Sequence, residues 1–71
     1  MIYERDVELI TRYKAAGLTV RELANCLAMP PGTVAGKING FSEPLNYQQR
    51  KAVLDLIEDT RKHSGDQDGH N

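Results

Sequence analysis

Apolar residues recur every three or four positions in four stretches of this chain, which is the spacing of one face of a helix. The first stretch spans residues 3–16 and is followed by a glycine that would end a helix. Its expected inward face consists of Tyr3, Val7, Ile10 and Tyr13. Charged residues fall mainly on the opposite face, so we expect an amphipathic helix that packs on the rest of the chain.

The stretch over residues 18–40, LTVRELANCLAMPPGTVAGKING, predicts two short helices joined by a tight turn. Thr19 and Glu22 have the spacing of a capping box, which starts the first of them. Pro31 suits the first position of the second helix, because the amide at that position has no partner in any helix. Gly40 ends this helix, since glycine enters the left-handed conformation at low cost. Two helices in this arrangement form a helix-turn-helix.

A last helix is predicted after a second capping signature, Asn46 and Gln49, and runs to about Lys62. Residues 63–71 contain no apolar residue and are expected to form a disordered polar tail. The chain of 71 residues is long enough for one small domain, which we place at residues 1–62. The predicted fold is all-α, a compact domain of four to five helices. Three aromatic residues are expected to close the edge of its core: Tyr13, Phe41 and Tyr47.

The middle stretch resembles the helix-turn-helix of the Cro and phage-repressor family, the XRE-like group, whose usual pattern is similar to L-T-x-x-E-L-A-x-x-L-G-V-S-x-x-T-I-S-x-x-x-N-G. The identical positions are Leu18, Thr19, Glu22, Leu23, Ala24, Leu27, Thr33, Asn39 and Gly40. The close resemblance covers about a third of the chain, and the motif is moderately specific. It implies a lambda-repressor-like fold and a small sequence-specific DNA-binding regulator, a phage- or prophage-like transcriptional repressor. Such a protein places the helix over residues 31–39 in the major groove of double-stranded DNA as a homodimer.

The chain departs from this family at the turn and in the second helix. Ala28 stands where the family usually carries glycine, and alanine costs more in a left-handed conformation, so we expect a slightly altered turn. The second helix of the family opens with polar side chains that reach base edges. In this chain the corresponding positions have no side-chain donor or acceptor: Pro30, Pro31, Gly32, Ala35 and Gly36. Specificity would then depend on contacts with thymine methyl groups and on DNA shape.

The net charge of the chain is −1, but the charge is unevenly distributed. Residues 1–11 have a net charge of −2, and residues 52–71 have −3. Residues 12–51 contain six basic and two acidic residues, a net charge of +4, as expected of a phosphate-binding segment. The candidate DNA-binding residues are Arg21, Pro31, Gly32, Thr33, Gly36, Lys37, Asn39, Arg50 and Lys51.

Several of these residues also have an ordinary structural interpretation. Arg21 and Lys37 suit phosphate contacts, and equally suit solvated surface charges. Thr33 can contact DNA or satisfy a backbone group at the helix end. Gly32 and Gly36 each cost a helix about 1 kcal/mol relative to alanine. Either close approach of DNA or of a partner helix offsets that cost, or the surface is simply not optimised.

Other classes of function find little support in the sequence. It contains no pair of catalytic carboxylates, no Gly-rich phosphate loop and no nucleophile motif, so we expect neither an enzyme nor a cofactor, a metal or a small-molecule substrate. Cys26 is the single cysteine and is expected to fill space as a partly buried side chain. Charges near the N-terminus replace the apolar run of a signal peptide, and no stretch has transmembrane length, so a cytoplasmic location without a membrane partner is predicted.

A second function remains open. The chain could keep the helix-turn-helix fold and bind a protein partner through the same smooth, glycine-rich face. For self-association, the position of the last helix and of the segment around Phe41 suggests these two parts of the chain.

Overall fold

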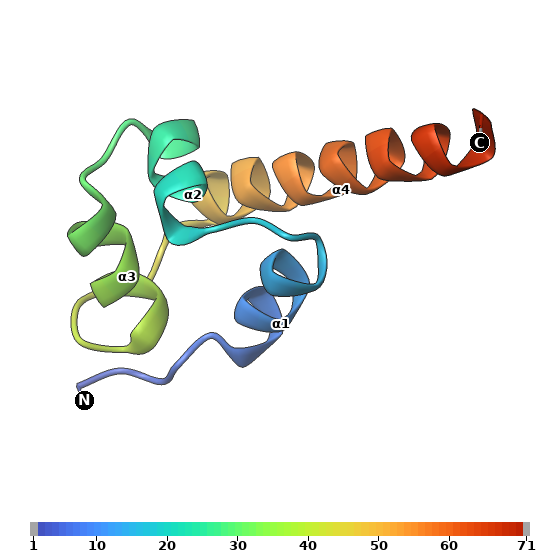
Figure 1. Ribbon diagram of the computed structural model, residues 1–71. Helices are drawn as coiled ribbons and strands as arrows, with labels where there is room; N and C mark the ends of the chain where they lie inside the picture. The colour runs from blue at the N-terminus through green and yellow to red at the C-terminus, as the bar shows by residue number, and fades with distance from the viewer. Residues whose placement is uncertain (1, 71) are drawn as a thin grey trace.

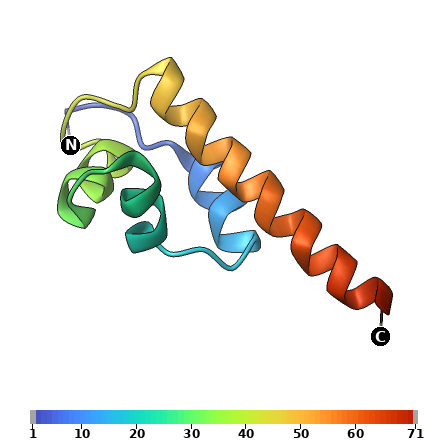
Figure 2. The same cartoon turned by 90° about the horizontal axis from the view of Figure 1, so that it is seen from above.

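The computed structural model describes the backbone of residues 2–70 and the side chains of residues 2–63. In this part of the chain the fold is all-α, with four helices and no strand. The helices are α1 (Val7–Ala15), α2 (Val20–Leu27), α3 (Pro31–Asn39) and α4 (Tyr47–His70) (Figure 1). The prediction of an all-α fold is confirmed, and the helix count is four rather than five. The C-terminal half of α4 projects beyond the other three helices in both views (Figures 1 and 2).

Helix α1 begins four residues later than the apolar spacing predicts, so the predicted start at residue 3 is wrong. The side chain of Asp6 caps the helix by accepting a hydrogen bond of 3.2 Å from the amide of Leu9. The segment before it is extended along the C-terminal end of α3. There the amides of Ile2 and Tyr3 donate to the carbonyl of Gly40, and that of Asp6 to the carbonyl of Ile38, each at 2.9 Å. These bonds give three backbone amides acceptors outside the helices' own hydrogen bonding.

The inward face of α1 is shifted as a consequence. Leu9, Ile10 and Tyr13 are buried, whereas Tyr3 is 42% and Val7 62% exposed. The sequence pattern therefore identified two of the three buried residues of this helix and missed Leu9.

Helix α1 ends at a glycine, as predicted. Gly17 has φ +80°, and its amide donates to the carbonyl of Lys14 at 3.0 Å. The amide of Leu18 reaches back to the carbonyl of Tyr13 at 2.9 Å. This pair of bonds is a Schellman motif, in which a left-handed residue lets the last carbonyls of the helix find donors.

Both predicted capping boxes are present. The amide of Thr19 donates to Glu22 Oε1 at 3.2 Å, and the amide of Glu22 donates to Thr19 Oγ1 at 3.4 Å. At the start of α4, Asn46 and Gln49 exchange the same two bonds at 3.0 and 2.8 Å. Local sequence alone determines these starts, because each box needs only residues three positions apart.

The turn between α2 and α3 depends on a strained alanine. Ala28 ends α2 with φ 56° and ψ 43°, in the left-handed region, and is the one non-glycine residue with positive φ among the described residues. The steric cost of this conformation therefore falls on the Cβ of Ala28.

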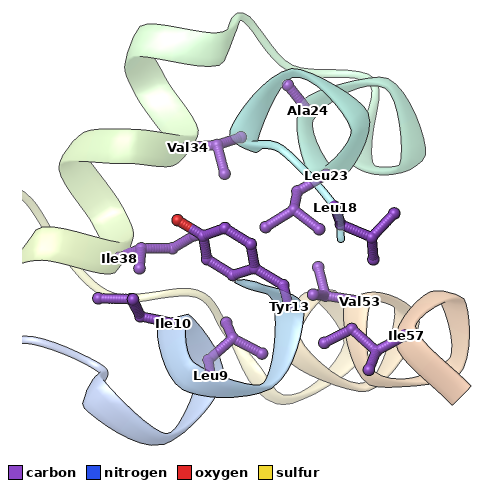
Figure 3. Close-up of a cluster of buried hydrophobic side chains, with 10 residues drawn as sticks. All are labelled: Leu9, Ile10, Tyr13, Leu18, Leu23, Ala24, Val34, Ile38, Val53 and Ile57. Atoms are coloured by element: carbon purple, nitrogen blue, oxygen red, sulfur yellow. The ribbon is translucent and has the colours of Figure 1, made fainter. Parts of the chain in front are cut away.

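The core lies between the four helices, with α2 packed on both α3 and α4, and α1 on α4. Figure 3 shows the ring of Tyr13 among Val34, Ile38 and Leu23 at its centre. The buried side chains are Leu9, Ile10, Tyr13, Leu18, Leu23, Ala24, Val34, Ile38, Val53 and Ile57. No polar or charged side chain of the described residues is buried, so the interior is held by apolar contact.

Three expectations about single side chains are wrong. Phe41 is 64% and Tyr47 79% exposed, so of the three aromatic residues only Tyr13 closes the core. Cys26 is also exposed, and its Sγ contacts the carbonyl of Ala52 at 3.8 Å. Cys26 lies in α2, Phe41 in the connector after α3, and Tyr47 at the start of α4. The packing of the helices leaves all three side chains on the surface.

Helix α4 continues to His70, past the predicted end near Lys62. The side chains of residues 64–70, and residue 71 as a whole, lie outside the described residues. The expected disorder of residues 63–71 therefore remains a prediction, as does the division of the chain at residue 62.

Candidate nucleic-acid interface

Helix α3 is anchored by two buried apolar residues, and its exposed part is its N-terminal turn. Val34 and Ile38, four residues apart, are buried against the core. The first three residues, Pro31, Gly32 and Thr33, are all exposed. Because the buried part of the helix begins only at Val34, its N-terminal turn is presented to solvent.

The N-terminal end of α3 has no side-chain cap. Pro30 occupies the capping position and forms no side-chain bond, although its carbonyl accepts from the amides of Thr33 and Val34 at 3.1 and 3.2 Å. The amide of Gly32 has no acceptor among the described residues. A helix N-terminus with a free amide has a partial positive charge and suits an anion such as phosphate.

Neither glycine of α3 is required by the fold itself. A Cβ on Gly32 would meet nothing within 4 Å, and one on Gly36 would meet only Ser42 Oγ, at 3.5 Å, an ordinary contact. Both residues have ordinary helical geometry rather than a positive φ. The helix-propensity cost of about 1 kcal/mol each is thus not explained by packing within the chain.

Two of the three polar candidates on α3 are already hydrogen-bonded. Asn39 Nδ2 donates to the carbonyl of Ala35 at 2.8 Å, within its own helix. Lys37 Nζ donates to the carbonyl of Glu43 at 3.3 Å, and this bond is longer and exposed to solvent. The hydroxyl of Thr33 is exposed and forms no side-chain bond with the described residues. Thr33 and Lys37 are therefore the groups on α3 that can turn to a ligand at least cost.

Arg50 is engaged elsewhere in the fold. Its Nε donates to Asp6 Oδ2 at 3.1 Å and its Nη2 to Glu8 Oε1 at 2.7 Å, so that α4 is joined to the start of α1. These bonds raise the pKa of the Arg50 guanidinium. The hydrogen bond from Arg50, followed by the positive charge of Arg12, lowers the pKa of Glu8 below its ordinary value of 4.5. A phosphate at Arg50 would have to compete with two carboxylates.

The remaining basic candidates, Arg21 and Lys51, are exposed, and neither forms an ion pair with a described residue. Arg21 lies in the first turn of α2, and Lys51 in the first turns of α4. The candidates therefore divide into a group on α3, one cation each on α2 and α4 without an ion pair to a described residue, and Arg50, which belongs to the α1–α4 contact.

The segment of residues 2–6 is a neighbour of α3 that the apolar spacing does not reveal. Its backbone bonds to Gly40 and Ile38 hold the C-terminal end of this helix. Asp6 is a preferred N-cap residue directly before a helical pattern. A helix start after Asp6 would have left residues 2–6 outside the predicted helix.

A hollow lies between α1 and α4. It is lined by Arg12, Ala15, Leu54, Ile57, Glu58 and Arg61. Its two arginines pair with carboxylates on their own helices, Arg12 with Glu8 at 3.5 Å and Arg61 with Glu58 at 3.3 Å. Over the described residues, no group of three or more His, Cys, Asp or Glu side chains is placed to hold a metal ion.

No protein-family model matches the sequence, and neither curated proteins nor solved structures give a significant match to it. Among the helices of the described residues, none is both long enough and apolar enough to cross a membrane.

Proposed function

We propose that this chain is a small DNA-binding transcriptional regulator in which α2 and α3 form a helix-turn-helix and α3 enters the major groove. The observation that carries the proposal is the N-terminal turn of α3, which is exposed, uncapped by any side chain and free of Cβ atoms at Gly32. The resemblance of residues 18–40 to the phage-repressor pattern supports the same assignment. So do the capping box of α2 and the left-handed residue at its end.

The exposed groups suit contact with the DNA backbone better than direct reading of bases. A free amide at a helix N-terminus and isolated cations, here Arg21, Lys37 and Lys51, are typical phosphate ligands. Base pairs are distinguished by bidentate side chains such as Arg, Asn and Gln, and the one such residue on α3, Asn39, is bonded within the helix. We therefore propose that this protein selects its sites mainly through close backbone approach and DNA shape.

The test is binding of the purified chain to labelled random-sequence duplex DNA at about 50 and 200 mM salt. The variant Arg21→Ala, Lys37→Ala removes two cations near α3. The matched control, Arg61→Ala, Lys62→Ala, removes the same two residue types from the far part of α4. We expect binding that weakens steeply with salt, weakens further in the first variant and is unchanged in the control.

No binding by a folded, concentrated sample at the lower salt would reject DNA binding. Equal losses in both variants would show only an effect of net charge and would reject the assignment of the site to α2 and α3.

A protein-binding role for the same face is the second candidate. It is favoured by the scarcity of free polar side chains on α3, because a smooth surface of Pro31, Gly32 and Ala35 suits the close approach of another helix. This candidate predicts little affinity for DNA at any salt concentration.

A further inference from the structure

Asp6 forms hydrogen bonds to three different helices. Its amide donates to the carbonyl of Ile38 in α3 at 2.9 Å. Its Oδ1 accepts from the amide of Leu9 in α1 at 3.2 Å, and its Oδ2 accepts from Arg50 Nε in α4 at 3.1 Å. We call the two bonds that lead from Arg50 through Asp6 to Ile38 the Asp6 link. The Asp6 link joins the start of α4 to the C-terminal end of α3.

The C-terminal end of α3 takes donors from the N-terminal segment. The last carbonyls of a helix have no partner within that helix. In α3 the carbonyl of Ile38 accepts from Asp6, and the carbonyl of the C-cap residue Gly40 accepts from Ile2 and Tyr3, all at 2.9 Å. Ile38 and Gly40 are both buried, and a buried carbonyl without a donor is strongly disfavoured. The end of α3 and residues 2–6 are therefore held together.

Apolar contacts hold α3 in the core but define its direction less narrowly. Val34 and Ile38 are buried, and Figure 3 shows the ring of Tyr13 beside them. Apolar contact is non-directional, whereas a hydrogen bond requires a limited range of distances and angles. The bonds from residues 2–6 therefore define the direction of α3. Because α3 has only nine residues, a shift at its C-terminal end also moves its exposed N-terminal turn.

Arg50 holds the side chain of Asp6 in a partly buried ion pair. The exposed fraction is 33% for the Arg50 side chain and 26% for that of Asp6, so solvent screens this pair less than a fully exposed one. Arg50 Nη2 also donates to Glu8 Oε1 at 2.7 Å, which keeps the guanidinium beside α1. Among the described residues, the side chain of Arg50 bonds to Asp6 and Glu8 and not to α3. The hydrogen-bonded path from Arg50 to α3 therefore runs through Asp6.

We propose that Arg50 and Asp6 are positioning residues for α3, and that Arg50 contributes to the DNA interface through the Asp6 link and not as a phosphate ligand. The inference deepens the proposed function and rests on it for this consequence, because α3 is the helix that the proposed function places in the major groove. The Asp6 link itself belongs to the free chain and is measured without DNA.

The first experiment is amide hydrogen exchange of the full chain without DNA. Arg50→Gln removes the charge that holds Asp6. The matched control is Arg61→Gln, which breaks the exposed ion pair with Glu58 on the same helix. Relative to amides in the middle of α2, which report global stability, we expect the amides of Asp6 and Tyr3 to exchange at least about threefold faster in Arg50→Gln and at an unchanged rate in the control.

A second variant shows whether Arg50 acts through Asp6. Asp6→Ser keeps an N-cap acceptor for α1, but the serine side chain is too short to reach Arg50. In the Asp6→Ser background, Arg50→Gln should cause no further change in exchange at the amide of Tyr3. Unchanged exchange at Asp6 and Tyr3 in Arg50→Gln alone would overturn the proposal, and so would a full additional effect in the double variant.

The second experiment is binding to random-sequence duplex DNA between about 50 and 200 mM salt. We expect Arg50→Gln and Asp6→Ser each to weaken binding by about 3- to 10-fold, although they change the net charge in opposite directions. The slope of log K against log salt should stay the same, because no phosphate contact is lost. The control is Glu8→Gln, which removes one negative charge as Asp6→Ser does but leaves the Asp6 link in place, and it should not weaken binding.

A phosphate contact of Arg50 would give the opposite results. The salt slope would then fall by about 0.9 in Arg50→Gln, and Asp6→Ser would strengthen binding by freeing the guanidinium. Either result would overturn the proposal. A chain that binds DNA but shows unchanged exchange in Arg50→Gln refutes the Asp6 link alone. A chain that shows the expected exchange but binds no DNA refutes the proposed function, and with it the assigned consequence, while the Asp6 link stands.

Discussion

Replacing Gly40 by alanine tests whether the N-terminal segment holds the end of α3. Gly40 has φ +86°, and a Cβ added there would overlap the carbonyl oxygen of Tyr3 and lie 3.1 Å from its carbonyl carbon. Gly17 has a similar φ of +80°, but its Cβ would meet nothing within 4 Å. The variants Gly40→Ala and Gly17→Ala therefore share the same backbone strain and differ only in the steric overlap.

The expected difference follows from the hydrogen bonds at stake. Alanine in the left-handed region costs about 1–2 kcal/mol, and the stiffer unfolded chain returns about 0.4–1 kcal/mol. For Gly17→Ala this leaves a loss of stability of about 0.5–1 kcal/mol. In Gly40→Ala the segment must also move away from α3, which weakens the three backbone bonds donated by Ile2, Tyr3 and Asp6. At about 0.5–1.5 kcal/mol each, these bonds add about 1.5–4.5 kcal/mol.

Thermal unfolding followed by circular dichroism measures this difference. A change of 1 kcal/mol shifts the Tm of a domain of this size by about 4–8 °C, so Gly40→Ala should melt at least about 6 °C below Gly17→Ala. Amide hydrogen exchange at Asp6 should also become faster in Gly40→Ala alone. Equal Tm values for the two variants would refute the reasoning, because the overlap with Tyr3 would then have no energetic consequence.

Three further predictions concern the helix ends and the ion pairs. Ala28→Gly relieves the left-handed strain and should raise the Tm by about 2–8 °C. The same change at the helical residue Ala15 should lower the Tm. A lower Tm for Ala28→Gly would contradict the assigned strain. Thr19→Ala removes the hydroxyl that accepts from the Glu22 amide, and should lower the free energy of unfolding by about 1 kcal/mol in urea titrations. An unchanged urea midpoint of unfolding would argue against the cap. Glu8 has a pKa below its ordinary value of 4.5, so its ion pairs stabilise the fold above that pH and are lost as the pH falls through the lower, folded-state value. The Tm difference between wild type and Glu8→Gln should accordingly shrink below pH 4.5, and a difference that stays constant with pH would exclude this linkage.

The candidate site was predictable wherever it depends on local backbone chemistry. The sequence located α3 correctly, from Pro31 to Asn39 with Gly40 as its C-cap, because a proline start and a glycine end act on the residues beside them. It could not show that Arg50 is held by two carboxylates, because the Asp6 partner lies 44 positions away in the chain. Nor could it show that Asn39 is bonded to the helix carbonyl of Ala35, since a surface amide has several rotamers and only the packed helix selects one.

The sequence by itself determined that this chain is helical and located at least one end of each of its four helices, because capping boxes, a proline start and left-handed glycines act over a few residues. Only the tertiary structure decided that residues 2–6 leave the first helix to bond to α3, and that Tyr3, Val7, Phe41 and Tyr47 remain exposed. An apolar residue at helical spacing can face the core or the solvent, and the choice is made by the neighbouring elements. Those neighbours are brought together by folding, so the pattern of one segment cannot contain them.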